Sequence, residues 1–177
     1  EYDIEALRDQ VAFVLQKNTL FSGTLRENMR WGNEDATDEQ IIEALKHAQA
    51  WEFVSQYDDG LDHWVEQGGE NFSGGQKQRL TIARALIKSP KIIVLDDSTS
   101  AVDMATDAKI QQTFKEDLGD ITTIIIAQRI SSVQHADRII VMNEGEIESI
   151  GDHNTLLKIS PIYREIYESQ QKGVVGQ

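Results

Sequence analysis

Residues 72–79, Phe-Ser-Gly-Gly-Gln-Lys-Gln-Arg, constrain the fold and chemistry of this chain more than any other segment. Ser73 is a good N-cap, and Gly74 and Gly75 remove side chains where a ligand would touch backbone. Apolar residues follow at helical spacing, which predicts a helix from near Ser73 to about Lys88. The free N–H groups and dipole of such a helix favour a bound phosphate. Taken alone, an ordinary capped helix after a glycine turn explains the pattern equally well.

A short apolar run, Ile92–Leu95, follows this helix and ends in Asp96 and Asp97. A run of this kind is typical of a strand buried on both faces in a parallel sheet. Open α/β sheets place ligands at the carboxyl ends of their strands. One Asp there can hold Mg²⁺ through water while its neighbour orients an attacking water. Taken alone, paired acids that merely form a turn remain the simpler interpretation.

Together, these elements resemble the nucleotide-binding domain of ABC (ATP-binding cassette) ATPases. Five segments match the motifs of that family in order: the Q-loop at Gln16, the signature at Phe72–Gln76, the Walker B strand at Ile92–Asp96, the D-loop at Ser100–Asp103 and the switch loop at Ala127–Val133. The resemblance extends from Val11 to about Gln170. It implies an α/β fold with a P-loop NTPase-like parallel sheet core, incomplete in this chain, and an inserted α-helical subdomain.

The resemblance also implies the domain boundaries. The RecA-like core is assigned to residues 1–21 and 89–177, and the α-helical subdomain with the signature helix to residues 22–88. Periodicity predicts the elements of both parts: helices at Thr24–Trp31, Asp38–Gln49 and Ala50–Gln56, strands at Val11–Leu15, Ile92–Leu95, Ile121–Ile126 and Arg138–Met142, a hairpin turn at residues 143–146 before a strand at Ile147–Ile150, helices from about Thr155 to Gln170, and a frayed end at residues 172–177.

Composition narrows the possible functions. The 177 residues are 40% hydrophobic, which is enough for one substantial core. A net charge of −13 disfavours a nucleic-acid partner, because duplex binding needs a basic surface. The chain has no cysteine, and its longest apolar runs have the length of strands rather than of membrane spans. With the resemblance, this predicts a soluble domain at the cytoplasmic face of the cell membrane.

One motif of the family is not found in these residues. No string of the form G-x-x-x-x-G-K-[ST], the phosphate loop that cradles a nucleotide, occurs in the sequence. In the family that loop lies upstream of the Q-loop, so the chain is interpreted as the C-terminal part of a larger polypeptide. We expect the isolated chain to bind ATP poorly and to be inactive as an ATPase.

The segment Thr19–Asn28, Thr-Leu-Phe-Ser-Gly-Thr-Leu-Arg-Glu-Asn, resembles the sequence that follows the Q-loop in exporters whose ATPase is fused to membrane helices. By this resemblance it faces the coupling helix of the transmembrane domain. Exposed apolar side chains near Phe21 would then form a docking patch. The simpler alternative, in which Leu20 and Phe21 are only core contacts and Asn28 is a surface residue, explains less of the string.

The resemblance implies ATP and Mg²⁺ as cofactors, with Asp96 and Gln16 coupled to Mg²⁺ and nucleotide. Asp97 and Gln128 occupy the catalytic positions, where most active members have Glu and His. Asp is one methylene shorter than Glu, and misplacing a catalytic group by about 1 Å can cost on the order of 10²-fold in rate. The Gln amide can donate a hydrogen bond but does not titrate near neutrality. A third departure is Gln67, in a segment that resembles the exporter X-loop, where Glu is usual.

Together, these departures resemble the degenerate-site half of a heterodimeric multidrug exporter. In that arrangement two unlike ATPase domains bind two ATP molecules head to tail. Ser73, Gly74, Gly75 and Gln76 would serve the ATP of the partner. Ser100 and Asp103 are assigned to the D-loop. The predicted partners are therefore a second ABC ATPase domain and a transmembrane coupling helix, with no nucleic acid.

Two other classes of protein remain as alternatives. A soluble ABC ATPase of DNA repair or translation is disfavoured by the acidic charge and by the exporter-like segment. A non-hydrolytic regulatory partner would use the fold only to dimerise around nucleotide, and the residues Asp97 and Gln128 favour it for this half. The intact signature favours a chain that still completes an active partner.

Overall fold

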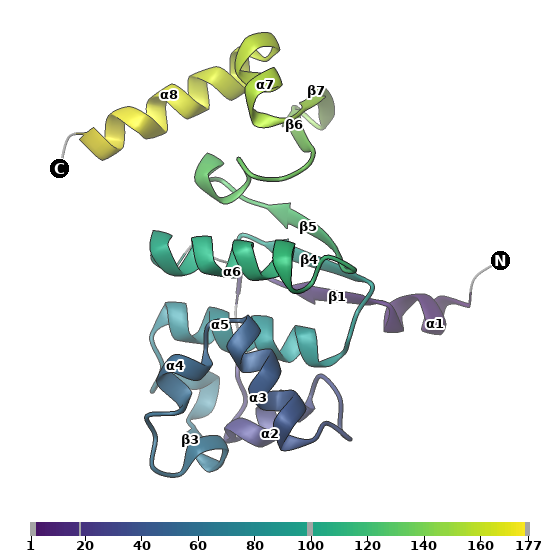
Figure 1. Cartoon of the computed structure of the whole chain (residues 1–177), viewed down its shortest axis with the longest axis vertical. Helices are drawn as coiled ribbons and strands as arrows, with labels where there is room; N and C mark the ends of the chain where they lie inside the picture. Colours follow the sequence, from purple (N-terminus) through teal and green to yellow (C-terminus); the bar gives the residue numbers. More distant parts are fainter. Residues whose placement is uncertain (1–2, 18, 99–100, 176–177) are drawn as a thin grey trace. The chain divides into compact units, whose positions relative to one another are not determined.

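The computed structural model describes residues 3–17, 19–98 and 101–175, with side chains described as far as residue 172. The chain divides into two compact units, Glu1–Ile126 and Ala127–Gln177, which are described separately (Figure 1). The predicted boundaries of the α-helical subdomain, at residues 22 and 88, divide the chain differently and remain a prediction. In the described residues, no helix is both long enough and apolar enough to cross a membrane.

The first unit is built on a parallel sheet of three strands in the order β1-β4-β5. Its helices and strands are α1 Ile4–Asp9, β1 Val11–Val14, β2 Gly23–Thr24, α2 Leu25–Arg30, α3 Asp38–His47, α4 Trp51–Val54, β3 Trp64–Val65, α5 Gly74–Ile87, β4 Ile92–Asp96, α6 Met104–Glu116 and β5 Thr122–Ile126. Two short 3₁₀ segments flank β3, at Gly60–Asp62 and Gln67–Gly69. The parallel register confirms the predicted α/β sheet core.

Only one face of this sheet is buried in the described chain. Ala12 and Val14 of β1 and Ile93 and Leu95 of β4 point into the core, because α5 packs against that side. On the opposite face, Phe13 is 63% exposed. The prediction that Ile92–Leu95 is buried on both faces is therefore wrong for these residues. The strand alternates between half-buried and buried positions.

Helices α2, α3, α4 and α5 gather at one side of the sheet (Figure 1). Both α2 and α3 pack on α5, and the fully buried Leu25, Ile41, Leu45 and Leu80 belong to one core that continues into the sheet. Capping fixes where these helices begin. Thr37 accepts a hydrogen bond from Gln40 N at 3.3 Å, and the Gln40 side chain accepts one from Thr37 N at 2.9 Å. Thr37 is therefore the N-cap of α3.

The second unit has a smaller core of its own. It contains a 3₁₀ turn at Ile130–Ser132, the antiparallel hairpin of β6 Ile139–Asn143 and β7 Glu146–Gly151, and the helices α7 His153–Ile159 and α8 Pro161–Val175. The turn between β6 and β7 has positive φ at Glu144 and Gly145, as a tight two-residue hairpin turn requires. The predicted hairpin is confirmed.

The predicted frayed end is wrong as far as Val175. Helix α8 continues through Lys172 to Val175 although it includes Gly173, and a single glycine costs only about 1 kcal/mol relative to Ala within a helix. Residues 176–177 lie outside the described residues. Helices α1 and α6 and the short strands β2 and β3 were not predicted from the periodicity.

Candidate functional site

The signature helix α5 begins with a complete capping box. Ser73 has extended backbone angles, and its hydroxyl accepts a hydrogen bond from Gln76 N at 3.2 Å. The Gln76 side chain accepts one from Ser73 N at 2.9 Å. The chain thus enters the helix in one defined conformation, and two glycines occupy the first helical turn. This confirms the helix predicted from near Ser73.

The two glycines also have a packing role that the sequence did not reveal. A Cβ placed on Gly75 would lie 2.9 Å from the carbonyl oxygen of Ala101 and 3.6 Å from Val102 Cα. A Cβ on Gly74 would lie 3.3 Å from the Ala101 methyl group. Ala101 and Val102 therefore pack directly on the first turn of α5, and a side chain at Gly75 would force their backbone to shift.

Gln78 was missed as a functional candidate. Its side chain is 3% exposed, and its Oε1 accepts a hydrogen bond from Ala101 N at 3.0 Å. Arg79, one residue later, donates to the carbonyl of Gln49 at 2.8 Å and lies over the ring of Phe53. Burial lowers the pKa of Arg79 from its ordinary value. Side chains on successive positions of α5 therefore hold the helix against its surroundings.

The acidic pair lies at the carboxyl end of β4, as predicted. Asp96 is the last residue of the strand, paired with Ile126 of β5. Asp97 has a φ of 46°, which is uncommon for a residue with a side chain, and its N–H donates to the Ile126 carbonyl at 2.8 Å. The Gln16 Nε2 donates to Asp97 Oδ2 at 3.2 Å. The structure thus brings together two predicted site residues that are 81 positions apart.

The described part of the D-loop leads into α6. Asp103 is the N-cap of that helix, and its carboxylate accepts a hydrogen bond from Thr106 N at 2.9 Å. That backbone hydrogen bond holds the pKa of Asp103 below its ordinary value. Ser100, the other predicted D-loop residue, lies outside the described residues.

Gln128 belongs to the second unit. Its backbone carbonyl accepts a hydrogen bond from Gln170 Nε2 of α8 at 2.7 Å, and Gln170 Oε1 accepts one from Ile130 N at 2.9 Å. A single amide side chain therefore clamps the loop that carries Gln128. Gln170 was not predicted as a site residue, because only the fold brings α8 to this loop.

The donors at the end of β4 fit a magnesium ion bound with a nucleotide. In the described residues, no three His, Cys, Asp or Glu side chains lie close enough to form a metal site alone. Mg²⁺ at nucleotide sites needs only one or two carboxylates, with phosphates and water as its remaining ligands. Asp96, with Gln16 hydrogen-bonded to the adjacent Asp97, provides oxygen donors of this type.

The exporter-like segment is held by Asn28, which is 1% exposed. Its side chain exchanges two hydrogen bonds with the backbone of Phe21, at 2.8 and 2.9 Å, and donates a third to the Thr24 carbonyl at 3.0 Å. Gly23 has a φ of 142°, and a Cβ there would meet the Glu27 carboxylate at 2.6 Å. Asn28 is therefore a buried clamp for the loop that presents Phe21, not a surface residue.

An aromatic pair stands at this loop. Phe21 and Trp31 stack with their ring centroids 4.6 Å apart, and they are 42% and 68% exposed. The predicted exposed apolar group near Phe21 is present. Its larger member, Trp31, was not singled out from the sequence because it lies ten residues away, at the C-terminal end of α2.

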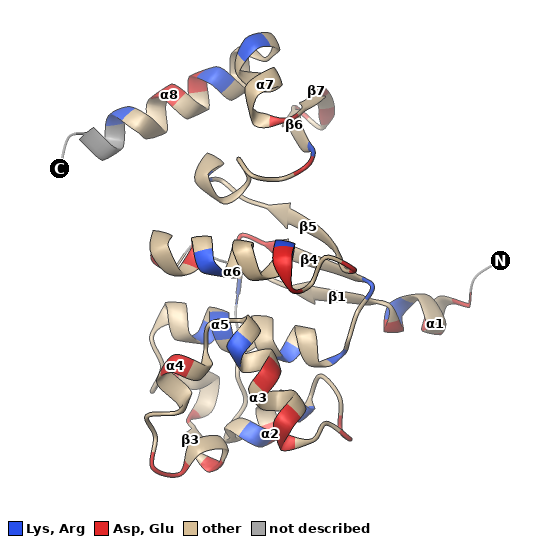
Figure 2. Ribbon diagram, viewed as in Figure 1, with Lys and Arg blue, Asp and Glu red and all other residues tan. Residues whose placement is uncertain are grey.

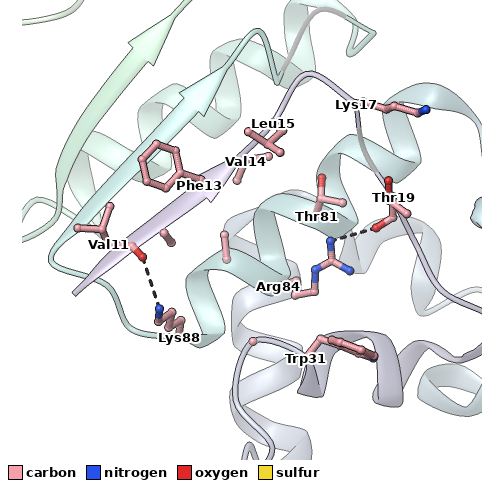
Figure 3. Close-up of a pocket in the computed structure, with 13 residues that line it drawn as sticks. Val11, Phe13, Val14, Leu15, Lys17, Thr19, Trp31, Thr81, Arg84 and Lys88 are labelled. Carbon is pink, nitrogen blue, oxygen red and sulfur yellow. Dashed lines mark hydrogen bonds between the residues drawn. The ribbon is translucent and has the colours of Figure 1, made fainter. Parts of the chain in front are cut away.

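A pocket of about 410 Å³ lies between β1, α5 and Trp31 (Figure 3). Arg84 of α5 projects into this region, and its Nη2 donates to the Thr19 carbonyl at 3.0 Å (Figure 3). The Arg84 guanidinium lies 5.8 Å from the centre of the Phe21 ring. Its Nη1 is fully covered and has no hydrogen-bond partner among the described residues. An unpaired buried donor of this kind costs about 1–3 kcal/mol.

The fold, the capped glycine helix and the acidic strand end are those of the ATP-binding cassette class, and comparison with known proteins agrees. Residues 1–100 match the sequence profile of the ABC transporter family. The chain is 46% identical over 174 residues to the uncharacterized ABC transporter ATP-binding protein YknU of Bacillus subtilis, covering 98% of this chain and 30% of that protein. It is 43% identical over 177 residues to the ATP-dependent lipid A-core flippase of Legionella pneumophila, covering 100% of this chain and 30% of the flippase.

A solved structure of a bacterial Atm1-family ABC exporter with ATP bound superposes with a TM-score of 0.89 at 34% identity, covering 94% of this chain and 29% of that one. The chain therefore belongs to the ABC transporter family and has the α/β P-loop fold of an exporter nucleotide-binding domain. It spans about 30% of the length of the curated relatives it matches.

Proposed function

We propose that this chain is part of the ATP-binding domain of an exporter that couples ATP binding and hydrolysis to transport across a membrane. The observation that carries the proposal is the capped start of α5, where the Ser73–Gln76 capping box fixes the first turn and Gly74 and Gly75 carry no side chains. A helix start of this kind attracts phosphate. The exporter fold of the structural relative supports the same function.

In this proposal the signature acts on the ATP of a partner domain. Ser73, Gly74, Gly75 and Gln76 present the N–H groups and dipole of α5 to phosphates held by the partner. The D-loop, with Ser100 and Asp103, crosses to the same partner. Because Ala101 packs directly on the glycines, movement of the D-loop would displace the first turn of α5, and movement of that turn would displace the D-loop.

The chain's own nucleotide site binds ATP but hydrolyses it slowly. Asp96 and Gln16 would hold the Mg²⁺–nucleotide complex, in which the ion would supply neutralisation of phosphate charge. Asp97 is too short to position water as Glu does, and Gln128 lacks the imidazole of the usual switch residue. Gln16 also holds the Asp97 carboxylate by a hydrogen bond. These features support an unlike partner that contributes the competent site, as in a heterodimeric exporter.

The pocket beside Phe21 and Trp31 receives a coupling helix from the transmembrane domain, and the chain works at the cytoplasmic face of the membrane. Two stacked and exposed rings form an apolar surface of the kind that marks a protein interface. Asn28 fixes the loop that presents Phe21, so this surface is formed before docking.

The degenerate site is tested by restoring the usual residues in the full transporter. We expect the wild type to retain nucleotide after rapid removal of free ATP, and Asp97→Glu with Gln128→His to release product and raise ATP turnover. A wild type that retains no nucleotide, with turnover unchanged in the double variant, would show that this site is not degenerate. The second candidate, a non-hydrolytic regulator, is favoured by Asp97 and Gln128 and predicts no turnover in the wild-type complex.

A further inference from the structure

The switch loop is firmly anchored from Ile130 onward. The Ile130 side chain is 5% exposed and belongs to the core of the second unit. Its carbonyl accepts hydrogen bonds from Val133 N at 3.0 Å and from Gln134 N at 2.8 Å, so this part of the loop forms a compact turn. Gln128 precedes the turn and its side chain is exposed. Its backbone carbonyl is the group by which α8 holds it.

One side chain of α8 bonds to the loop on both sides of Arg129. Gln170 Nε2 donates to the Gln128 carbonyl at 2.7 Å, and Gln170 Oε1 accepts from Ile130 N at 2.9 Å. The partners fix the orientation of the amide, because a carbonyl only accepts and an N–H only donates. Two hydrogen bonds from one planar group set both the distance and the direction of the loop backbone relative to α8.

Helix α8 gives Gln170 a fixed support. Tyr163, Tyr167 and Gln170 follow one another at spacings of four and three residues, which places them on one face of the helix. Tyr163 is 3% exposed, and Tyr167 packs against the same core that contains Ile130. The helix also packs on the 3₁₀ turn that follows the switch residue. The core of the second unit therefore sets the position of the amide.

An amide is the type of side chain that this place on α8 requires. The loop presents one carbonyl and one N–H group, so its partner needs both a donor and an acceptor. A charged side chain offers only donors or only acceptors. Figure 2 shows that charged side chains of both signs occur along the described part of α8, and these are Arg164, Glu165, Glu168 and Lys172. Gln170 therefore matches the loop in a way that these neighbours do not.

We infer that Gln170 is a positioning residue for the switch loop, and that its two hydrogen bonds set the place from which Gln128 acts on the nucleotide of this chain. The inference rests on the proposed function for the role of Gln128. It adds that the C-terminal helix controls how long this site retains its nucleotide. A switch residue displaced by about 1 Å loses much of its effect on a bound phosphate.

The experiment measures how long the full transporter retains nucleotide after rapid removal of free ATP. Gln170→Met keeps a side chain of similar length but removes the N–H donor and leaves only a weak acceptor. We expect release about tenfold faster than from wild type, since two hydrogen bonds to the loop are lost. The matched control Gln171→Met changes the neighbouring exposed glutamine and should leave release unchanged. Equal release from Gln170→Met and wild type would overturn the inference.

The variant Gln128→Ala separates positioning of the switch residue from general support of the fold. If Gln170 acts through Gln128, Gln170→Met should have no further effect on release in the Gln128→Ala background. The same tenfold effect in both backgrounds would show that Gln170 supports the fold alone, and it would refute the positioning role.

The variant Gln170→Glu divides the two hydrogen bonds. Its carboxylate still accepts from Ile130 N, but it places an oxygen instead of an N–H group against the Gln128 carbonyl. Amide exchange at Ile130 should therefore stay close to the wild-type rate, while nucleotide release should again be about tenfold faster. This variant also replaces Gln170→Met if that protein does not fold. Unchanged release would overturn the inference, whatever the exchange rate at Ile130.

A wild type that retains no nucleotide would contradict the degenerate site but would leave the role of Gln170 testable. At a site that hydrolyses ATP, Gln170→Met should lower kcat about tenfold and leave KM for ATP nearly unchanged, because the switch residue acts in the transition state. An unchanged kcat would then overturn the inference separately from the proposed function.

Discussion

Gly75→Ala is expected to weaken the contact between the first turn of α5 and residues 101–102. The new Cβ would lie 2.9 Å from the Ala101 carbonyl oxygen, inside van der Waals contact with a backbone atom that no side-chain rotation can move. Gly75 lies in a regular helix, so the substitution is compatible with the local backbone. The cost must therefore come from displacement of the neighbouring segment.

Two opposing effects set the magnitude. Overpacking in a close contact costs about 1–3 kcal/mol, and contact with a backbone atom that cannot rotate away lies in the upper part of this range, at about 2–3 kcal/mol. Ala in place of Gly within a helix gains about 1 kcal/mol. The net loss falls on the contact itself, at about 1–2 kcal/mol. This corresponds to roughly 5- to 30-fold in the equilibrium for opening the Ala101 segment. Gly74→Ala meets only a methyl group at 3.3 Å and should cost less than half as much.

The hydrogen bond from Ala101 N to Gln78 Oε1 provides the assay. Amide exchange at Ala101, followed in the full transporter by mass spectrometry, should accelerate about 5- to 30-fold in Gly75→Ala. Gly74→Ala serves as the matched control and should change exchange only slightly. Unchanged exchange in Gly75→Ala would refute the claim that the glycine is required for this packing.

Three further substitutions test the hydrogen bonds made by Asn28, Gln170 and Asp103. Asn28→Ala should lower the free energy of unfolding by about 2–3 kcal/mol, because three backbone groups lose their hydrogen-bond partner. The control variant Asn154→Ala, at an exposed position, should leave the free energy of unfolding unchanged. Equal urea midpoints for Asn28→Ala and wild type would contradict this. Gln170→Ala should speed amide exchange at Ile130 by about tenfold, because the Ile130 N–H loses its acceptor. Unchanged exchange would show that Gln170 does not hold this loop. Because the pKa of Asp103 is lower in the folded state, its ionised carboxylate stabilises the fold at pH values above the unfolded-state pKa of about 3.9, and this stabilisation is lost as the pH falls through the folded-state pKa. Asp103→Asn keeps the cap without the charge, so the free energy of unfolding should fall less steeply with decreasing pH than in wild type. Parallel pH profiles of the two proteins would contradict this.

Local sequence patterns predicted the elements that carry the site. Ser73 and the glycines mark the start of α5, and the apolar run before Asp96 marks β4, because capping and strand burial depend on neighbouring residues. The hairpin at Glu144 and Gly145 follows from turn chemistry in the same way. These features require no knowledge of distant contacts.

The remaining features depend on tertiary contacts that no local pattern contains. Gln78 and Gln170 are ordinary polar helix residues until the fold places a backbone group beside each amide. Arg84 appears in the sequence only as one cation of an amphipathic helix, yet the fold buries one of its donors, which has no hydrogen-bond partner in the part of the chain that the structure describes. The exposed second face of the sheet was also unforeseen, because the apolar composition of Ile92–Leu95 does not tell which neighbours cover each side.

The central claim, that this chain completes the active site of its partner while its own site is degenerate, is tested most directly by ATP turnover of the full transporter. Ser73→Ala and Asp97→Ala, each made in this chain alone, are compared with wild type. We expect Ser73→Ala to abolish ATP turnover and Asp97→Ala to leave it nearly unchanged. Loss of turnover in Asp97→Ala, with activity retained in Ser73→Ala, would show instead that this site hydrolyses ATP itself.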